Sequence, residues 1–404
     1  MNLRYLLLAS LLFITTCSLA SDWPGYRGNG SASSASNIPL KWNKTENVLW
    51  TAPLPGQGPA SPIVIGNTVF VTASSGYKQD RLHVFAFDGS TGKKQWERQL
   101  WATGRTECHP KSAMAAPTPV ADGERVYALF ATADLVCFDH QGNMLWYRPL
   151  SQEYPSISNQ VGMASSPILA SGTLIIPMQN SGEASFYLGV DPKTGKDKWK
   201  VKLNKEVAWS TPCLMQQKDR TLVLYQDDVG LHAIDAANGQ PAWNFTTIKT
   251  NTAIIGPSVV GSDKVVIAGD EFAVIQPGPD DTTPKIVWKT NKIRLMYCTP
   301  VQLDGMMLTV NNNGVINCLK TDDGTVLWQQ RVKGNFAASP VKVGDKVLVV
   351  NEEGTTYIIE PSMKEGKIVA TNSVGAENML GTPAVANDRI YLRSDGMLYC
   401  VGKK

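Results

Sequence analysis

The sequence is poor in histidine and nearly neutral in charge. It has 4 histidines in 404 residues, and none stands at a spacing that would place two imidazoles on one metal ion. Lys and Arg number 38 against 35 Asp and Glu, and the two signs are mixed along the chain, so no basic stripe is available for a phosphate backbone. These absences argue against a histidine metal centre and against nucleic acid as a partner.

Long apolar runs are missing after the first twenty residues. Residues 1–20 have the form of a secretory signal peptide, because Arg4 precedes an apolar stretch at 6–14 and Ser18-Leu19-Ala20 offers a cleavage site. The apolar stretch is shorter than the roughly 18 residues of a membrane-spanning helix. The sequence therefore predicts an exported protein of the periplasm or cell envelope, or a secreted one. Membrane contact is expected only if Cys17 carries a lipid, which the sequence leaves open.

A small residue or threonine followed by proline and an apolar run recurs eight times, at intervals of 40 to 57 residues. Each interval contains three apolar runs separated by Gly, Asp or Asn turns, and most add a fourth short run that carries tryptophan. Four short strands repeated at this period predict propeller blades. The recurring prolines are Pro62, Pro119, Pro167, Pro212, Pro257, Pro300, Pro340 and Pro383.

The predicted fold is therefore all-β, an eight-bladed β-propeller of four-stranded antiparallel blades. The eighth unit stops at Tyr399-Cys400-Val401 without a fourth strand, and Val48-Leu49-Trp50 resembles the missing one. An N-terminal strand is expected to close the ring, because closure removes the free edges of an open sheet array. The expected division is a signal peptide at 1–20, an N-terminal arm at 21–45 and one propeller domain at 46–404, in a monomer.

The repeated tryptophan is expected to fill the gap between neighbouring blades rather than to hold a cofactor. In the seventh unit, Val369 stands near the expected place. Cys137, Cys318 and Cys400 occupy one third-strand position where other units have Ala or Gly. Because they lie in separate units and in a small buried position, the thiols are predicted to be mostly free and buried. The repeated tryptophans are Trp96, Trp146, Trp199, Trp243, Trp288 and Trp328.

The repeat resembles the PQQ-like propeller repeat. The resemblance rests on the Ser/Thr-Pro start, on Asp88 with Thr91-Gly92 and Trp96, and on Asp235 with Gly239 and Trp243. The opening Asp22-Trp23-Pro24-Gly25-Tyr26-Arg27-Gly28 is similar to that of exported BamB-like repeat proteins. The resemblance implies a non-catalytic scaffold that binds envelope proteins or a small ligand and acts in outer-membrane protein assembly, although one architecture hosts many functions.

Two further interpretations stay open. The quinoprotein alcohol dehydrogenases, more distantly similar, imply a PQQ-dependent dehydrogenase that uses PQQ with Ca²⁺. Members of the methanol dehydrogenase kind carry two adjacent cysteines, and this sequence has no Cys-Cys pair. We therefore expect no catalytic residue, no metal and no cofactor. Carbohydrate binding at the propeller mouth is the other interpretation, favoured by Trp101, Trp209 and Tyr297.

Candidate ligand-binding residues lie in the loops that precede the prolines, because these loops converge at one mouth of a propeller. His109 and Lys111 fall in the longest interval between repeats. Trp209 could stack on a planar ligand, and Arg294 or Lys111 could meet a carboxylate. Glu377 could offer oxygen to a cation.

Overall fold

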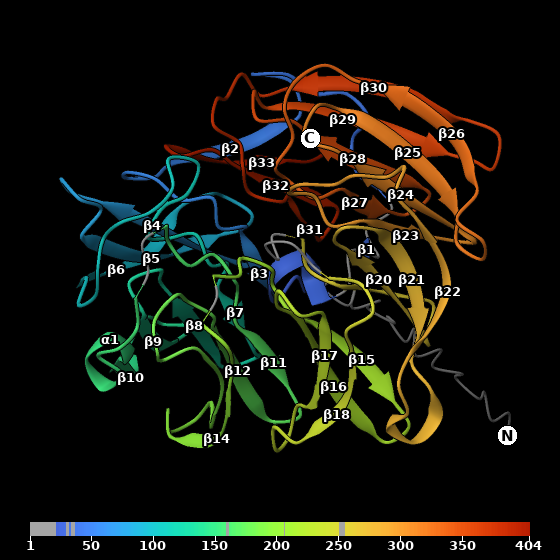
Figure 1. Ribbon diagram of the computed structural model, residues 1–404. Coiled ribbons are helices and arrows are strands. Elements are labelled where there is room, and N and C mark those ends of the chain that lie inside the picture. Colours follow the sequence, from blue (N-terminus) through green and yellow to red (C-terminus); the bar gives the residue numbers. More distant parts are fainter. Residues whose placement is uncertain (1–21, 30–31, 34–36, 159–160, 206, 250–254) are drawn as a thin grey trace, which may run out of the picture.

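The computed structural model describes residues 22–29, 32–33, 37–158, 161–205, 207–249 and 255–404. The predicted signal peptide and Cys17 lie outside these residues. Almost all of the regular secondary structure in the described chain is β-strand, and eight sheets surround a central axis (Figure 1). The predicted eight-bladed β-propeller is confirmed. Within the described residues, no helix is long and apolar enough to cross a membrane.

The blades follow the chain from the inner to the outer strand. The strands of blades 1 to 4 are β3 (Ile63–Ile65), β4 (Thr68–Ser75), β5 (Arg81–Asp88), β6 (Lys94–Trp101), β7 (Val120–Ala121), β8 (Arg125–Leu129), β9 (Asp134–Asp139), β10 (Met144–Pro149), β11 (Ile168–Ala170), β12 (Thr173–Met178), β13 (Phe186–Val190), β14 (Asp197–Lys202), β15 (Cys213–Gln217), β16 (Arg220–Gln226), β17 (Leu231–Asp235) and β18 (Pro241–Phe245).

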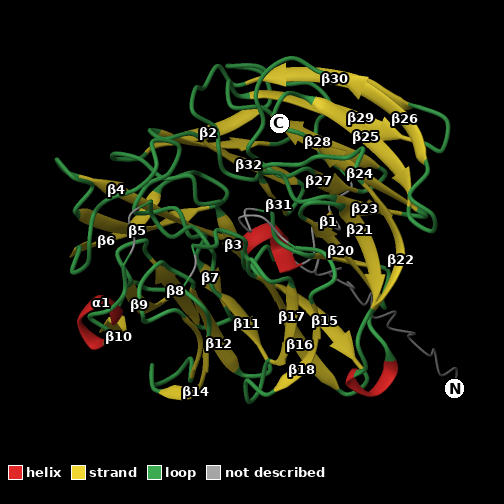
Figure 2. Ribbon diagram, viewed as in Figure 1, coloured by secondary structure: helices red, strands yellow, loops and turns green. Residues whose placement is uncertain are grey.

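Blades 5 to 8 continue the same order. Their strands are β19 (Ser258–Val260), β20 (Lys264–Ala268), β21 (Phe272–Gln276), β22 (Lys285–Thr290), β23 (Val301–Leu303), β24 (Met306–Val310), β25 (Val315–Lys320), β26 (Val326–Arg331), β27 (Val341–Val343), β28 (Lys346–Val350), β29 (Thr355–Pro361), β30 (Gly366–Ser373), β31 (Ala384–Ala386), β32 (Arg389–Arg393), β33 (Met397–Val401) and β2 (Val48–Pro53). The short helical elements are η1 (Tyr26–Asn29), α1 (Leu150–Glu153) and η2 (Pro279–Asp281), which Figure 2 draws in red.

Local chemistry explains the blade hairpins. In the turn between β5 and β6, the Asp88 Oδ1 accepts the backbone N–H groups of Ser90 at 3.0 Å and Thr91 at 2.8 Å. Gly92 follows with φ of 72°, a left-handed conformation that glycine adopts at low cost. The central strands are buried on both faces because each blade lies between two others, and all six residues of β12 are buried.

The ring closes through strands from the two ends of the propeller, as predicted. β2 pairs antiparallel with β33, with Val48 opposite Val401 and Trp50 opposite Cys400. The first and last strands of the propeller therefore form one blade, and no blade is left with a missing outer strand.

The repeated tryptophans join neighbouring blades, as predicted. The Trp96 indole N–H of blade 1 donates to the His140 carbonyl of blade 2 at 2.8 Å. A Cβ added to Gly142 would lie 2.7 Å from the Trp96 ring, so only glycine fits beneath it. Trp243 is an exception, since its indole nitrogen is buried without a hydrogen-bond partner in the described chain. The same contact with the next blade recurs at Trp50, Trp146, Trp199, Trp288 and Trp328.

A small residue stands opposite most of these tryptophans on the adjacent strand. Cys137 faces Trp146, and Cys318 faces Trp328. In blade 7 the large residue is on the third strand and the small one on the fourth. Ile358 faces Ala370, one residue beyond Val369. The six described cysteines are all free, and four of them are buried, as predicted. Burial raises the pKa of the Cys318 thiol to about 12, so this thiol stays neutral and packs as a small apolar group.

The segment before β2 enters the centre of the ring. Trp23 forms an antiparallel bridge with Val64 of blade 1, through hydrogen bonds of 2.7 and 2.9 Å. The Pro24 carbonyl accepts the Ala121 N–H of blade 2 at 2.8 Å. η1 then lies within the ring near its axis (Figure 1), and β1 (Ala32–Ser33) pairs parallel with β27. We call residues 22–29 the plug, since they occupy the central channel.

Candidate functional site

A cavity of about 300 Å³ lies at the mouth of the propeller, against Tyr26 of the plug. We call it the mouth cavity. Its residues come from the plug, from the insertion between β6 and β7, and from the residues before the repeated prolines. The lining residues are Tyr26, Pro59, Ser61, His109, Lys111, Ser112, Ala116, Thr118, Val161, Ala164, Ser166, Trp209, Thr211, Gly256, Tyr297, Ala337, Leu380 and Thr382.

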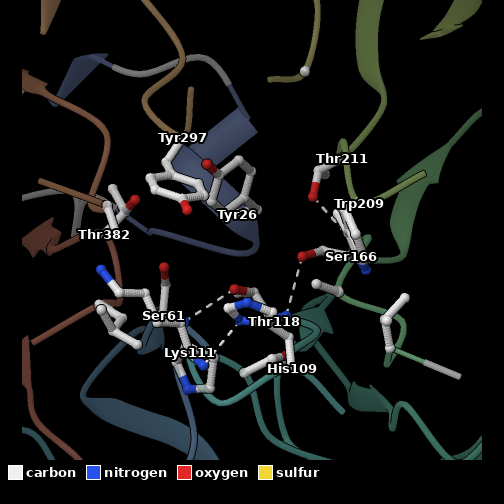
Figure 3. A pocket seen from close by; sticks show the side chains of 18 residues that line it. Tyr26, Ser61, His109, Lys111, Thr118, Ser166, Trp209, Thr211, Tyr297 and Thr382 are labelled. Atoms are coloured by element: carbon white, nitrogen blue, oxygen red, sulfur yellow. Dashed lines mark hydrogen bonds between the residues drawn. The ribbon is translucent and has the colours of Figure 1, made fainter. Parts of the chain in front are cut away.

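A belt of hydroxyl groups surrounds part of the mouth cavity. The Ser61 N–H donates to Thr118 Oγ1, the Thr118 N–H donates to Ser166 Oγ, and the Ser166 N–H donates to Thr211 Oγ1, each at 3.0 Å. Figure 3 shows these links between successive blades. Each residue precedes a repeated proline, so the repeat itself positions the belt. Gly256 holds the equivalent place in blade 5 and offers no hydroxyl.

The belt leaves its hydroxyl groups as donors for a ligand. The hydroxyl oxygens of Thr118, Ser166 and Thr211 each accept an N–H from the preceding blade, so their protons are left to be donated. The belt continues on the other side of the ring, where the Thr299 N–H donates to Ser339 Oγ at 3.0 Å and the Ser339 N–H to Thr382 Oγ1 at 3.1 Å. The lining therefore favours a ligand that carries acceptor oxygens.

The insertion between β6 and β7 covers the mouth. The His109 N–H donates to the Val161 carbonyl at 3.0 Å, and His109 Nδ1 accepts the Lys111 N–H at 3.1 Å. Since Nδ1 is an acceptor, the proton of the neutral ring is on Nε2. Lys111 Nζ lies 2.9 Å from both carboxylate oxygens of Glu352 in blade 7, and 5.9 Å from the centre of the Tyr297 ring.

Three of the five predicted site residues meet in the mouth cavity: His109, Lys111 and Trp209. The Trp209 indole N–H donates to the Gly162 carbonyl at 2.7 Å, which fixes the ring. Arg294 and Glu377 are exposed and are not among the lining residues. Trp101 lies on the outer strand of blade 1, so it does not join Trp209 and Tyr297.

Sequence reasoning missed Tyr26 and the hydroxyl belt. The belt had a signal in the sequence, since Ser or Thr precedes the repeated proline in every unit except the one with Gly256. Tyr26 had no such signal in the sequence, because its position at the cavity depends on the plug entering the assembled ring. The Tyr26 hydroxyl lies 3.2 Å from Ser339 Oγ, and Figure 3 places its ring beside that of Tyr297.

The donor set of the mouth cavity does not fit a Ca²⁺-bound quinone. Ca²⁺ requires six to eight oxygen ligands, several of them carboxylates or amides. Among the described residues that line it, none has a carboxylate or carboxamide side chain. The described residues also form no cluster of three or more His, Cys, Asp or Glu that could hold a metal ion.

The fold and the mouth define a class of protein, the eight-bladed propellers built from PQQ-like repeats. A family model described as outer membrane protein assembly factor BamB matches residues 40–187, 183–280, 279–368 and 312–401. The chain belongs to this family.

Curated relatives include the assembly factor BamB of Yersinia pestis, 24% identical over 351 residues, which cover 83% of this chain and 82% of that protein. BamB of Burkholderia pseudomallei is 21% identical, with 87% of this chain and 96% of that protein covered. A polyvinylalcohol dehydrogenase of a Pseudomonas species is 24% identical over 74% of this chain, but only 48% of the enzyme is covered.

Solved structures share the fold. BamB from Moraxella catarrhalis superimposes with a TM-score of 0.63 at 16% identity, covering 88% of this chain and 97% of that one. A europium-containing methanol dehydrogenase gives a TM-score of 0.67 at 10% identity, with 93% of this chain and 90% of that one covered. At such identities the likeness concerns architecture alone.

Proposed function

We propose that this protein is a non-catalytic, exported propeller scaffold that takes part in outer membrane protein assembly by binding other envelope proteins. The observation that carries the proposal is the coverage of the sequence matches: those to assembly factors extend over most of both chains, whereas the match to the polyvinylalcohol dehydrogenase covers less than half of that enzyme. The described lining of the mouth cavity is consistent with this proposal, because those residues supply no carboxylate for a Ca²⁺-quinone pair.

Blade 1 provides the surface best suited to a protein partner. Its strands β4, β5 and β6 each have eight residues and extend further than those of most other blades. Tyr77 and Trp101 at this end are exposed to 97% and 64%. Arg81 lies 5.1 Å from the centre of the Trp101 ring. Exposed aromatic and arginine side chains are the residue types that dominate protein interfaces, and the outer edge of β6 can accept an added strand.

Site-specific photo-crosslinking in envelopes of the native host tests this proposal. A crosslinker at Trp101 should capture a component of the outer membrane assembly machinery, whereas one at Met144, an exposed apolar residue on the outer strand of blade 2, should not. Deletion of the protein should lower the amounts of folded outer membrane proteins, and Trp101→Ala should reproduce part of that loss. Unchanged amounts after deletion would contradict the proposal.

Export to the periplasm or cell envelope is part of the proposal. It is supported by the sequence of residues 1–20 and by the similarity to outer membrane assembly factors. Amino-terminal sequencing of the mature protein and cell fractionation test it, and metabolic labelling with a fatty acid tests lipid attachment at Cys17. Light scattering of the purified protein should give the mass of a monomer.

A further inference from the structure

Tyr26 of the plug also borders a second cavity of about 310 Å³ inside the ring. We call it the channel cavity. The inner strands of blades 4, 5 and 6 surround it, and Tyr26 lines both this cavity and the mouth cavity. The polar side chains that line it, besides Tyr26, are those of Arg27, Thr211, Ser258, Thr299 and Gln302.

Arg27 brings a buried positive charge to the channel cavity. Arg27 is only 7% exposed, and its Nη2 donates to the Pro300 carbonyl at 2.7 Å. Nε is buried and has no hydrogen-bond partner in the described chain. None of the ion pairs among the described residues includes Arg27. Burial lowers the pKa of this guanidinium, as expected for a charge without a counter-charge.

The backbone is strained at the same residue. Arg27 has φ of 54° and ψ of 26°, a left-handed conformation that residues with a Cβ rarely adopt. Gly28 follows with φ of 58°, and a Cβ there would lie 2.5 Å from the Trp23 ring. The bridge between Trp23 and Val64 holds this turn inside the ring. Strain and uncompensated charge at one buried residue are typical of functional positions.

The other groups in the channel cavity are donors or neutral. Ser258 and Thr299 provide hydroxyls, and the Gln302 Oε1 accepts the Gly261 N–H at 2.8 Å, which leaves its NH₂ group as a donor. Burial raises the pKa of the Cys213 thiol to about 12, so this lining residue adds no negative charge. No carboxylate is among the described residues that line the cavity.

From this geometry we propose that the channel cavity binds a small oxyanion, a phosphate or carboxylate group, as the counter-charge of Arg27. A guanidinium pairs with such groups through parallel N–H donors, and the hydroxyls and amide complete the set of donors. The space suffices, because one water occupies about 30 Å³ of liquid and the cavity has room for an anion with a few waters. The anion connects the plug to blades 5 and 6.

Isothermal titration of the purified protein with inorganic phosphate, at neutral pH and constant ionic strength, tests this proposal. We expect saturable binding at one site, weakened by about tenfold or more in Arg27→Met. Arg331→Met is the matched control, since Arg331 is exposed at the end of β26 and outside the channel cavity; it should bind as the parent does. Titrations with sulfate and acetate distinguish a tetrahedral oxyanion from a carboxylate by their relative affinities.

Crystals soaked in selenate provide a measurement that needs no variant. The anomalous signal of selenium should lie beside the Arg27 guanidinium in the channel cavity. Equal binding by Arg27→Met and the parent would overturn the proposal and leave Arg27 a purely structural tie to Pro300. Selenium found only at other positions would also overturn the proposal. The same holds if phosphate, sulfate and acetate show no saturable binding at millimolar concentrations.

Discussion

Lys111 and Glu352 form an ion pair across the mouth of the propeller. Both contacts between Lys111 Nζ and the carboxylate oxygens measure 2.9 Å, and the two residues belong to the insertion after blade 1 and to blade 7. The pair therefore holds the insertion over the mouth cavity. Because the Lys111 side chain is 46% exposed, solvent screens the attraction, and its effect on global stability is small.

We expect Lys111→Met to open the mouth without unfolding the protein. A double-mutant cycle with Glu352→Gln should give a coupling free energy of about 0.2–1 kcal/mol, the range of exposed pairs. Hydrogen exchange at residues 105–112 should become faster in both single variants, while exchange in β12 should stay unchanged. Unchanged exchange at 105–112 would mean that other contacts hold the insertion.

Trp96 and Trp101 lie on the same strand and should differ sharply when replaced by alanine. Trp96 is 8% exposed and packs on blade 2, so Trp96→Ala should lower the free energy of unfolding by about 3–5 kcal/mol. Trp101 is 64% exposed and contacts Arg81, so Trp101→Ala should cost about 0.5–1 kcal/mol. Denaturant titrations measure both, and similar losses would show that Trp96 does not join the blades.

The hydroxyl belt should be essential for the packing of the inner strands. Thr118→Val keeps the shape of the side chain but leaves the buried Ser61 N–H without its acceptor, which costs about 1–3 kcal/mol of unfolding free energy. Thr371→Val, on the exposed outer strand of blade 7, is the matched control and should stay within about 0.5 kcal/mol of the parent. A loss as small as that of the control would exclude the belt as a source of stability.

His232 and Asp227 should make stability depend on pH. Burial opposes the charge on His232, but the hydrogen bonds from its two ring nitrogens to Asp227 at 2.8 Å and Asn244 at 2.9 Å outweigh it, so the pKa of His232 is raised. Burial likewise opposes the Asp227 carboxylate, but the bond to His232 outweighs it and the pKa of Asp227 is lowered. The His232 contribution is complete below about pH 6.5 and is lost as pH rises through its folded-state pKa.

The Asp227 contribution is complete above about pH 4 and is lost as pH falls through its folded-state pKa, so the pair stabilises most between about pH 4 and 6.5. His232→Gln should therefore cost about 1–3 kcal/mol near pH 5.5 and less near pH 8.5, as measured by urea unfolding at both values. Asp227→Asn should show the same trend over this range. A cost for His232→Gln that does not change with pH would contradict the charged pair.

The sequence predicts the blades well because their determinants are local. The turn from Asp88 to Gly92 and the proline at each inner strand act within a few residues. The strands and turns can therefore be predicted from local sequence, before the arrangement of the ring is known. The position of Tyr26 and Arg27 could not be predicted in this way. Their environment exists only after eight blades enclose a channel, and no spacing in the sequence encodes that enclosure.

The candidate site was predicted in part for the same reason. His109 and Lys111 belong to the longest insertion, which is visible in the sequence, and the structure places them over the mouth. Arg294 and Glu377 precede strands in the same way but point to solvent, because loop direction depends on contacts with neighbouring blades. The residue before each proline was visible as a pattern, yet its hydroxyl has a partner only in the next blade.

Blade 8 takes its outer strand, β2, from before blade 1 and its inner strands from the end of the propeller. Synthesis therefore delivers β2 first and its partner β33 last, with every other blade made in between. During that time β2 is an unpaired strand and Trp50 has no small residue opposite it. The last step of folding is then the pairing of β2 with β33, two strands far apart in the sequence. Until they pair, the nascent chain stays accessible to chaperones and proteases. A chain shortened just before β33 should persist as an open, protease-sensitive array.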